Sequence, residues 1–266
     1  MYWPISTRNE HGRGGAGTQR NTLDTCSIRD FTTHGLTTEF SSPRLYASVA
    51  KLSSLLTSLS MKIICIGRNY AKHARELGNE APAEPIFFIK PTTACLYPGQ
   101  SIILPNLPGT IEHELELVVM IDSYAKDVPV GMALGMVASF TLGLDLTART
   151  VQDELKTKGL PWEKAKAWDG SAVLGEVELP MTASTDLQAF ALELKKNGET
   201  VQQGSTADMI FPVAELISYV SRFITLEPGD LLFTGTPAGV GPIAEGDVLE
   251  GFINGKRLLN ATVGKR

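Results

Sequence analysis

Short hydrophobic runs separated by turn residues form the main pattern of the chain after position 60. The runs either alternate apolar with polar residues or stay apolar over a few positions, and both patterns are typical of β-strands. Asn197-Gly198 and Asn254-Gly255 each lie between two such runs, and Asn-Gly is the strongest short-range signal of a β-hairpin. The predicted strands span residues 61–66, 86–89, 101–104, 114–121, 139–146, 191–196, 230–234 and 248–253.

Four segments instead repeat their apolar residues at helical spacing. The predicted helices span residues 70–77, 130–137, 148–156 and 213–223, and Asn69 is a candidate N-cap for the first of them. Strands and helices do not alternate regularly, as they would in a doubly wound fold. The pattern therefore predicts a β-rich α+β domain.

Residues 1–60 differ in composition from the rest of the chain. They contain 18 Ser or Thr, six Lys or Arg and four Asp or Glu. Apolar residues between Leu45 and Leu59 recur at helical spacing with no acidic residue among them, as in an amphipathic organelle presequence. Met61 also begins a strand-like run that looks like the natural first strand of a compact domain. Residues 1–60 can therefore be translated sequence from upstream of that domain, and we favour this interpretation. We expect residues 1–60 to be a non-core extension that is disordered or loosely docked, and residues 61–266 to form the folded domain.

The composition limits the class of partner. The 266 residues are 43% hydrophobic and 20% charged, with a formal net charge of -5. No apolar run approaches the ~18–20 residues of a membrane span, and no basic cluster suggests nucleic acid. Cys26, Cys65 and Cys95 are odd in number and share no short spacing, which argues against a disulfide framework and fits a reducing compartment. We expect a small-molecule partner and a cytoplasmic location, or a mitochondrial one if residues 1–60 are a presequence.

Three carboxylates alternate with other residues at the start of an apolar run. Glu112, Glu114 and Glu116 would share one face of a strand, with neighbouring pairs roughly 6–7 Å apart. Ionised carboxylates at the rim of a core are costly unless a cation neutralises them, and local basic residues are few. A hard divalent cation is the simplest explanation. The alternative is an edge strand with its glutamates in water.

Asp145 adds a further carboxylate where an apolar strand turns into a helix. It can be a helix cap, which is a common role for Asp. Together with two glutamates it also offers an all-oxygen set suited to Mg²⁺ or Mn²⁺, whereas zinc usually recruits His or Cys.

His73 and Glu76 form a second candidate group. They lie three positions apart on a predicted helix, so their side chains are neighbours. A carboxylate beside an imidazole can fix its tautomer and raise its basicity, as a base that activates water requires. Many surface His/Glu pairs have no such role, but Gly67-Arg68-Asn69-Tyr70 makes the kind of strand-to-helix turn where functional groups gather.

Six motifs in this order resemble those of the fumarylacetoacetate hydrolase family. They are Gly67-Arg68-Asn69-Tyr70-Ala71-Lys72-His73-Ala74-Arg75-Glu76, Ile89-Lys90-Pro91-Thr92, His113-Glu114-Leu115-Glu116-Leu117, Asp145-Leu146-Thr147-Ala148-Arg149, Gly159-Leu160-Pro161-Trp162 to Lys166, and Thr234-Gly235-Thr236-Pro237 to Gly241. The match runs from about Met61 to the C-terminus. The residues within these motifs are most similar to those of the short acylpyruvase and oxaloacetate-processing members.

The resemblance implies a fold, an assembly and a set of roles. The fold would be a mixed β-sandwich roll, usually in a homodimer. Mg²⁺ would be held by Glu114, Glu116 and Asp145, and water would be activated by His73 and Glu76 on a segment that acts as a lid. Substrate and metal-bound waters would be surrounded by Arg68, Tyr70, Lys90, Gln152, Lys166 and Thr236, with Lys166 also offsetting charge during catalysis. Glu112 departs from the pattern, because close relatives often have His there, and it is left out of the metal set.

These residues suit a small 2-oxo acid, which can chelate one Mg²⁺ through its carboxylate and keto oxygens. We predict hydrolysis of the carbon–carbon bond of acylpyruvates such as acetylpyruvate or fumarylpyruvate, giving pyruvate and a carboxylic acid. Oxaloacetate decarboxylation or keto–enol tautomerisation is the alternative, because one chelate and one base serve all three reactions. A non-catalytic metal- or ligand-binding protein is a second alternative, although a binder would need neither His73 nor Glu76.

Overall fold

Three β-sheets contain most of the regular structure in the computed structural model, which describes residues 61–76, 78 and 80–266. The largest sheet has eight strands in the order β2-β1-β13-β6-β7-β9-β3, with β10 pairing β7 off this path. Its strands are β1 (Ile63–Gly67), β2 (Ile86–Lys90), β3 (Cys95–Leu96), β6 (Leu115–Ile121), β7 (Val137–Asp145), β9 (Ala172–Leu174), β10 (Leu179–Pro180) and β13 (Leu231–Phe233). The β1/β13 and β3/β9 pairs are parallel and the others are antiparallel, so the sheet is mixed.

Two smaller sheets complete the β-structure. The five-stranded sheet has the order β12-β11-β15-β16-β4, and the three-stranded sheet has the order β14-β5-β8. Their strands are β4 (Ile102–Ile103), β5 (Ile111–His113), β8 (Thr147–Ala148), β11 (Ala191–Lys196), β12 (Glu199–Ser205), β14 (Gly241–Pro242), β15 (Val248–Ile253) and β16 (Lys256–Gly264).

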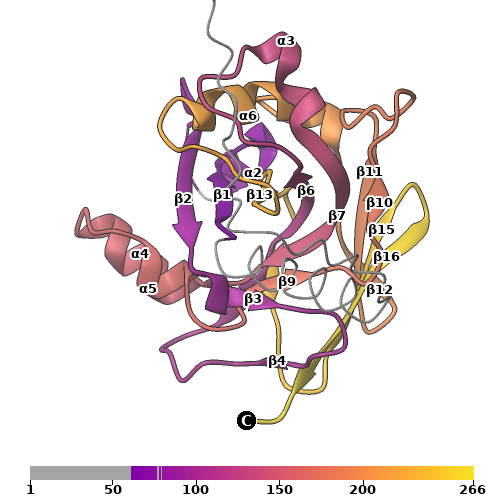
Figure 1. Ribbon diagram of the computed structural model, residues 1–266. Helices are drawn as coiled ribbons and strands as arrows, with labels where there is room; N and C mark the ends of the chain where they lie inside the picture. The colour runs from indigo at the N-terminus through magenta and orange to yellow at the C-terminus, as the bar shows by residue number, and fades with distance from the viewer. Residues whose placement is uncertain (1–60, 77, 79) are drawn as a thin grey trace, which may run out of the picture. The chain divides into compact units, whose positions relative to one another are not determined.

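The helices are short and lie around the sheets (Figure 1). They are α2 (Ala71–Glu76), α3 (Val130–Ala133), α4 (Arg149–Thr157), α5 (Glu163–Lys166) and α6 (Val213–Ser221), with 3₁₀ turns η1 (Thr92–Ala94), η2 (Leu134–Met136) and η3 (Thr206–Asp208). Helices α3 and α6 pack together at one end of the large sheet, while α4 and α5 lie on the opposite side of the view from β11 and β15 (Figure 1).

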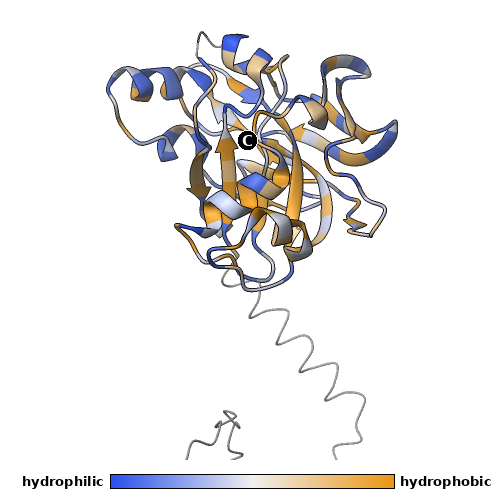
Figure 2. Ribbon diagram, turned by 90° about the horizontal axis from the view of Figure 1, so that it is seen from above, coloured by the Kyte–Doolittle hydropathy of each residue, from blue (hydrophilic) through white to orange (hydrophobic). Residues whose placement is uncertain are grey.

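The large sheet is buried on both faces at its centre. Leu117 and Val119 in β6 join the main core, whereas Val118 between them packs with Cys65 and Phe233 on the other face. This explains why β6 and β7 read as nearly continuous apolar runs. In Figure 2 the hydrophobic colours lie along the central strands and the hydrophilic ones gather at peripheral helices and loops. The predicted β-rich α+β class is confirmed.

Every strand and helix predicted from the pattern is present, with ends shifted by up to two residues, except that the segment 130–137 divides between α3 and η2. The prediction for Glu112 to Glu116 was wrong in one respect. These residues do not form one strand, because β5 pairs with β8 and β14 whereas β6 pairs with β7 and β13. Glu114 lies at the break between the two strands.

Asn69 does not cap α2 as predicted. Its side chain is fully buried, and its amide nitrogen donates to the carbonyl oxygens of Phe211 at 3.0 Å and Thr234 at 2.8 Å. Its amide oxygen accepts from the backbone N–H of Phe211 at 2.8 Å. Gly235 makes room for this contact, since a Cβ there would lie 2.7 Å from the Asn69 Cβ. Asn69 therefore ties the strand-to-helix turn to two distant segments.

The boundary expected at Met61 stays a prediction, because residues 1–60 lie outside the described part of the chain. No helix among the described residues is both long enough and apolar enough to cross a membrane.

Candidate active site

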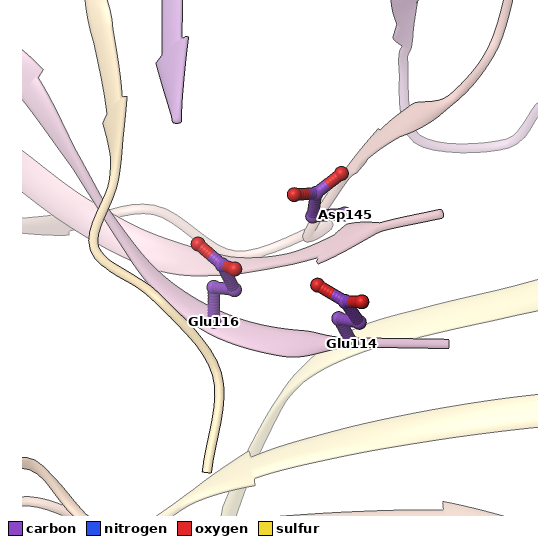
Figure 3. Close-up of side chains that lie close together, drawn as sticks. All are labelled: Glu114, Glu116 and Asp145. Carbon is purple, nitrogen blue, oxygen red and sulfur yellow. The ribbon is translucent and has the colours of Figure 1, made fainter. Parts of the chain in front are cut away.

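Three buried carboxylates converge where β6 and β7 lie side by side. Glu114, Glu116 and Asp145 each offer an oxygen, and these oxygens lie within 4.8 Å of one another (Figure 3). The antiparallel β6/β7 pair produces this arrangement, because Asp145 follows Leu144, the partner of Leu115, and its N–H donates to the Glu114 carbonyl at 2.9 Å. All three residues are at most 5% exposed.

Cationic side chains from distant segments surround the carboxylate trio. The Lys166 ammonium lies 2.8 Å from both Glu114 and Asp145, and Lys90 lies 2.7 Å from Asp145 Oδ1. Arg149 lies 2.6 Å from Glu114 and 2.7 Å from Glu112. Arg149 therefore bridges Glu112 and Glu114, and this ion pair gives the Glu112 carboxylate a partner other than a metal ion.

The surroundings of Glu114 and Glu116 shift the pKa values of these two carboxyls in opposite directions. Burial alone would raise the pKa of Glu114, but Lys166 and Arg149 hold the pKa of that carboxyl well below its usual range. Burial raises the pKa of Glu116 well above its usual value, and the neighbouring Asp145 and Glu114 charges raise it further. No cation among the described residues forms an ion pair with Glu116, whose one backbone contact is the Gly235 N–H at 2.8 Å.

The trio fits a hard divalent cation. Its donors are all carboxylate oxygens, the ligand type preferred by Mg²⁺ and Mn²⁺. Asp145 Oδ1 is buried and, although it is paired with Lys90 by distance, it accepts no well-formed hydrogen bond. A cation bound between the three groups would supply the positive charge that Glu116 lacks.

The predicted His73–Glu76 pair is present on α2. Nδ1 of His73 lies 3.2 Å from Glu76 Oε2, and the imidazole is nearly buried whereas the Glu76 side chain is 35% exposed. The backbone N–H of Gly239 donates to both carboxylate oxygens of Glu76 at 3.2 Å. Glu76 is therefore held on one side by a loop and on the other orients the imidazole.

One cleft brings most of these groups together. It encloses about 400 Å³, including space open to solvent at its mouth. Its lining comprises Ile66, Gly67, Arg68, His73, Phe88, Glu114, Glu116, Asp145, Arg149, Gln152, Lys156, Trp162, Lys166 and Thr236.

Eight of the eleven predicted site residues line this cleft: the trio, His73, Lys166, Arg68, Gln152 and Thr236. Glu76 is not among the lining residues, but it contacts His73, which is. Lys90 is fully buried beneath Asp145, where its ammonium also donates to the carbonyl and hydroxyl oxygens of Ser171. Tyr70 lines a neighbouring pocket with Lys72, Arg75 and Asp208, and burial raises the pKa of its phenol. The substrate-binding roles of Lys90 and Tyr70 stay predictions.

Sequence reasoning missed Arg149, Lys156, Trp162 and Phe88. Arg149 had a signal, because three acidic residues at alternate positions require counter-charges, and an arginine directly follows the Asp145-Leu146-Thr147-Ala148 segment. Its guanidinium also donates to Gln152 Oε1 at 2.6 Å, which orients that amide in the cleft. The other three have no distinguishing spacing.

The chain is similar to known proteins of one family. The family model "Fumarylacetoacetate (FAA) hydrolase C-terminal" matches residues 62–264. The oxaloacetate tautomerase FAHD1, mitochondrial, of Homo sapiens is 45% identical over 193 residues, covering 73% of this chain and 87% of that protein. The Arabidopsis thaliana protein of the same name is 45% identical over 194 residues, covering 73% and 86%.

Solved structures are similar as well. Fumarylpyruvate hydrolase from Pseudomonas aeruginosa, in complex with Mn²⁺ and pyruvate, aligns with a TM-score of 0.72 and 38% identity over 77% of this chain and 90% of that one. The 5-carboxymethyl-2-hydroxymuconate delta-isomerase from Mycobacterium smegmatis aligns with a TM-score of 0.67 and 35% identity over 78% and 80%. Because the family model spans nearly all of residues 61–266, the chain belongs to the fumarylacetoacetate hydrolase family.

Proposed function

We propose that the protein is a divalent-metal-dependent enzyme that hydrolyses the carbon–carbon bond of acylpyruvates. The observation that carries this proposal is that His73, oriented by Glu76, lines the same cleft as the three carboxylates. A water-activating base and an all-oxygen metal site are the two parts that this hydrolysis needs. The family relationship supports an enzyme of hydrolase or isomerase type.

Glu114, Glu116 and Asp145 would hold the metal, which we propose to be Mg²⁺, with Mn²⁺ as a substitute. When bound, the cation would polarise the carboxylate and keto oxygens of a 2-oxo acid and so weaken the bond at carbon 3. The Mn²⁺ in the similar fumarylpyruvate hydrolase supports a divalent ion of this class.

The chain's own residues supply the proton transfers. Glu76 at Nδ1 fixes the His73 tautomer that leaves Nε2 free to take a proton from water. The hydroxide then attacks the distal carbonyl carbon, the bond between that carbon and carbon 3 breaks, and carbon 3 takes from His73 the proton that water gave up, which completes pyruvate. Lys166, buried beside Glu114 and Asp145, would offset the negative charge that develops on the departing fragment. Arg68, Gln152 and Thr236 would hold the substrate.

Oxaloacetate chemistry is the second candidate, and the names of the FAHD1 relatives favour keto–enol tautomerisation over decarboxylation. Tautomerisation moves one proton at carbon 3, which the same His73 could carry. A non-catalytic binder is disfavoured because the Gly239 contact holds Glu76 in place for His73, an arrangement that ligand binding alone does not require.

The deciding experiment is a panel of acetylpyruvate, fumarylpyruvate and the keto and enol forms of oxaloacetate, assayed with purified protein and Mg²⁺. We expect pyruvate release from an acylpyruvate that EDTA abolishes. Tautomerisation without any acylpyruvate cleavage would replace our first candidate by the second. Thermal stabilisation by oxalate with no turnover of any compound would support the binder.

We also propose a homodimer, as family membership implies. Sedimentation should then give twice the 28.7 kDa chain mass, and a monomer would reject the proposal.

The location depends on residues 1–60. The mitochondrial names of relatives favour a presequence there, which would direct a fusion of residues 1–60 with a fluorescent protein to mitochondria. A cytosolic fusion would support the cytoplasmic location expected from the sequence.

A further inference from the structure

The guanidinium of Arg149 is shared between three acceptors. Its Nε donates to Glu112 Oε2 at 2.7 Å, its Nη2 to Glu114 Oε1 at 2.6 Å and its Nη1 to Gln152 Oε1 at 2.6 Å. Arg149 is only 9% exposed, so water screens these contacts little. The planar fork of an arginine side chain holds its acceptors in fixed directions. The positions of the three acceptors therefore depend on one another through Arg149.

The backbone fixes where the guanidinium lies. The N–H of Arg149 donates to the carbonyl oxygen of Thr110, the residue before β5, at 3.1 Å. Gly109 has a φ of 81°, and a Cβ there would collide with the Thr150 side chain. The segment that leads into β5 thus packs directly against the start of α4. The contact of Glu112 with Arg149 is therefore part of the fold and not a chance pairing of two surface side chains.

Both carboxylate oxygens of Glu114 already have partners in the protein. Oε1 accepts from Arg149 and from the Thr147 hydroxyl at 2.9 Å, and Oε2 accepts from the Lys166 ammonium at 2.8 Å. A divalent cation at the carboxylate trio has to compete with Arg149 and Lys166 for this carboxylate. A second carboxylate on the guanidinium weakens that competition, because Arg149 then shares its positive charge between two anions.

The balance of charge points in the same direction. Glu112 and the carboxylate trio carry four negative charges when all are ionised. The cations paired with them among the described residues are Arg149, Lys166 and Lys90. The group as a whole then keeps one negative charge, which attracts a divalent cation, and without the Glu112 charge it would keep none.

The same guanidinium sets the orientation of Gln152, which lines the cleft and is 4% exposed. A guanidinium carries only donors, so the Gln152 atom that faces Arg149 must be the amide oxygen. The amide nitrogen is then the end that is left for a ligand, and it can only donate. Gln152 is thus set to meet a carboxylate or keto oxygen as long as Arg149 stays in place.

We propose that Glu112 is a positioning residue for the metal and for Gln152, although it binds neither metal nor substrate itself. It draws part of the Arg149 charge away from Glu114, which strengthens the binding of a divalent cation at the carboxylate trio. It also anchors Nε of the guanidinium, which keeps the amide nitrogen of Gln152 directed at the ligand. The first effect depends on the charge of Glu112 and the second on its hydrogen bond. The inference rests on the proposed function for the presence of the metal.

The test measures Mn²⁺ and oxalate binding to the full-length protein by calorimetry, at a salt concentration of about 0.15 M that screens exposed charges. Glu112→Gln keeps an acceptor for Nε and removes the charge, whereas Glu112→Leu removes both. We expect both variants to bind Mn²⁺ about tenfold or more weakly than wild type. With Mn²⁺ at saturation, oxalate should bind to Glu112→Gln within about twofold of its wild-type affinity and to Glu112→Leu at least about fivefold more weakly.

Glu154→Gln is the control. It removes a carboxylate from α4, but the Glu154 side chain is 60% exposed and does not line the cleft. This variant should bind Mn²⁺ and oxalate as wild type does, and melting curves should show that the variants are folded. Glu112→Ser, whose side chain is too short to reach the guanidinium, takes the place of Glu112→Leu if the latter does not fold.

An Mn²⁺ affinity of Glu112→Gln equal to or higher than that of wild type would overturn the charge effect, and so would an equal loss in Glu154→Gln. Equal oxalate affinities in Glu112→Gln and Glu112→Leu would overturn the anchoring of Gln152. Wild-type protein that binds no Mn²⁺ would overturn both this inference and the metal-dependent function. The expected variant effects without turnover of any compound in the substrate panel would refute the proposed reaction alone.

Discussion

The backbone N–H of Gly239 donates to both carboxylate oxygens of Glu76 at 3.2 Å, which joins helix α2 to the loop after β13. The contact spans 163 residues and orients the carboxylate that in turn contacts His73. Glu76 is thus held from outside the helix, and its contact with Nδ1 fixes the orientation of the His73 imidazole. In a helix of only six residues, such an external contact supplies order that the helix itself lacks.

The first prediction concerns the charge of Glu76. In Glu76→Gln an amide oxygen can still accept from Gly239, but the negative charge that contacts Nδ1 of His73 is lost. We expect kcat for acylpyruvate hydrolysis to fall by about 10- to 100-fold, a part of the 10²- to 10⁴-fold contribution of a general base, with metal affinity unchanged. Steady-state kinetics and Mn²⁺ titration measure both. Glu80→Gln, at an exposed position outside the cleft, is the control, and an equal loss there would contradict the assigned role.

The second prediction separates the two glutamates of the carboxylate trio. Glu116 has a raised pKa, so the folded protein binds its proton more tightly than the unfolded chain does. The free energy of unfolding without metal should therefore fall as pH rises above about 4.5 toward the folded pKa. Glu116→Gln removes that charge and retains an acceptor for the Gly235 N–H. In EDTA at pH 7 it should be more stable than wild type by at least about 1 kcal/mol, since one pKa unit corresponds to about 1.4 kcal/mol.

Glu114→Gln is the matched contrast. It leaves Lys166 and Arg149 without their shared carboxylate, and breaking a buried pair costs about 3 kcal/mol. Both variants should lose the stabilisation that Mg²⁺ gives wild type, which is about 2.7 kcal/mol at 100 times Kd. Urea unfolding with and without Mg²⁺ measures these quantities. A Glu116→Gln protein that Mg²⁺ still stabilises fully would remove Glu116 from the ligand set.

The elements predicted most accurately are those whose ends are fixed locally. Strands β11 and β15 match their predicted bounds because Asn197 and Asn254 adopt positive φ at the hairpin turns that end them. The carboxylate trio was also accessible from local patterns, since Glu114 and Glu116 are two positions apart and Asp145 ends an apolar run, although Glu114 lies at the break between β5 and β6 and not within a strand. In these cases the determining interactions lie within a few residues of the sequence signal.

The missed features depend on register between distant segments. Glu112 pairs with Thr147 across β5 and β8, and this pairing brings Arg149 to Glu112 although they are 37 residues apart. The same register separates β5 from β6 and leaves Glu114 at the break. Asn69 failed as a cap for a similar reason, because its partners Phe211 and Thr234 lie in other parts of the chain. Local propensity carries no information on such contacts.

The third prediction tests the boundary of the folded domain. A protein that begins at Met61 should keep full activity and a melting temperature close to that of the full chain. The reasons are the change in composition at that residue and the position after it of the cleft residues that the structure describes. Differential scanning calorimetry and the acylpyruvate assay check this expectation. A large loss of stability would mean that residues 1–60 pack on the domain.

The fourth prediction concerns how His73 divides the candidate reactions. Hydrolysis needs a base that activates water, whereas decarboxylation of oxaloacetate needs only a polarised 2-oxo group and stabilisation of the resulting enolate. His73→Ala should therefore lose acylpyruvate cleavage by about 10²- to 10⁴-fold and retain much of any decarboxylation. Tautomerisation, which moves a proton at carbon 3, should fall together with hydrolysis if His73 is the proton carrier.

All three rates must be measured on the same preparations of wild type and His73→Ala, each saturated with Mg²⁺. Imidazole added to the variant gives a further readout, since a small base that restores hydrolysis would do so by replacing the missing ring rather than by repairing the fold. His113→Asn is not a suitable control, because His113 is buried and contacts Gln202, which in turn bonds Thr236 in the cleft. Equal losses of hydrolysis and decarboxylation would mean that His73 positions the substrate, and its role in activating water would have to be withdrawn.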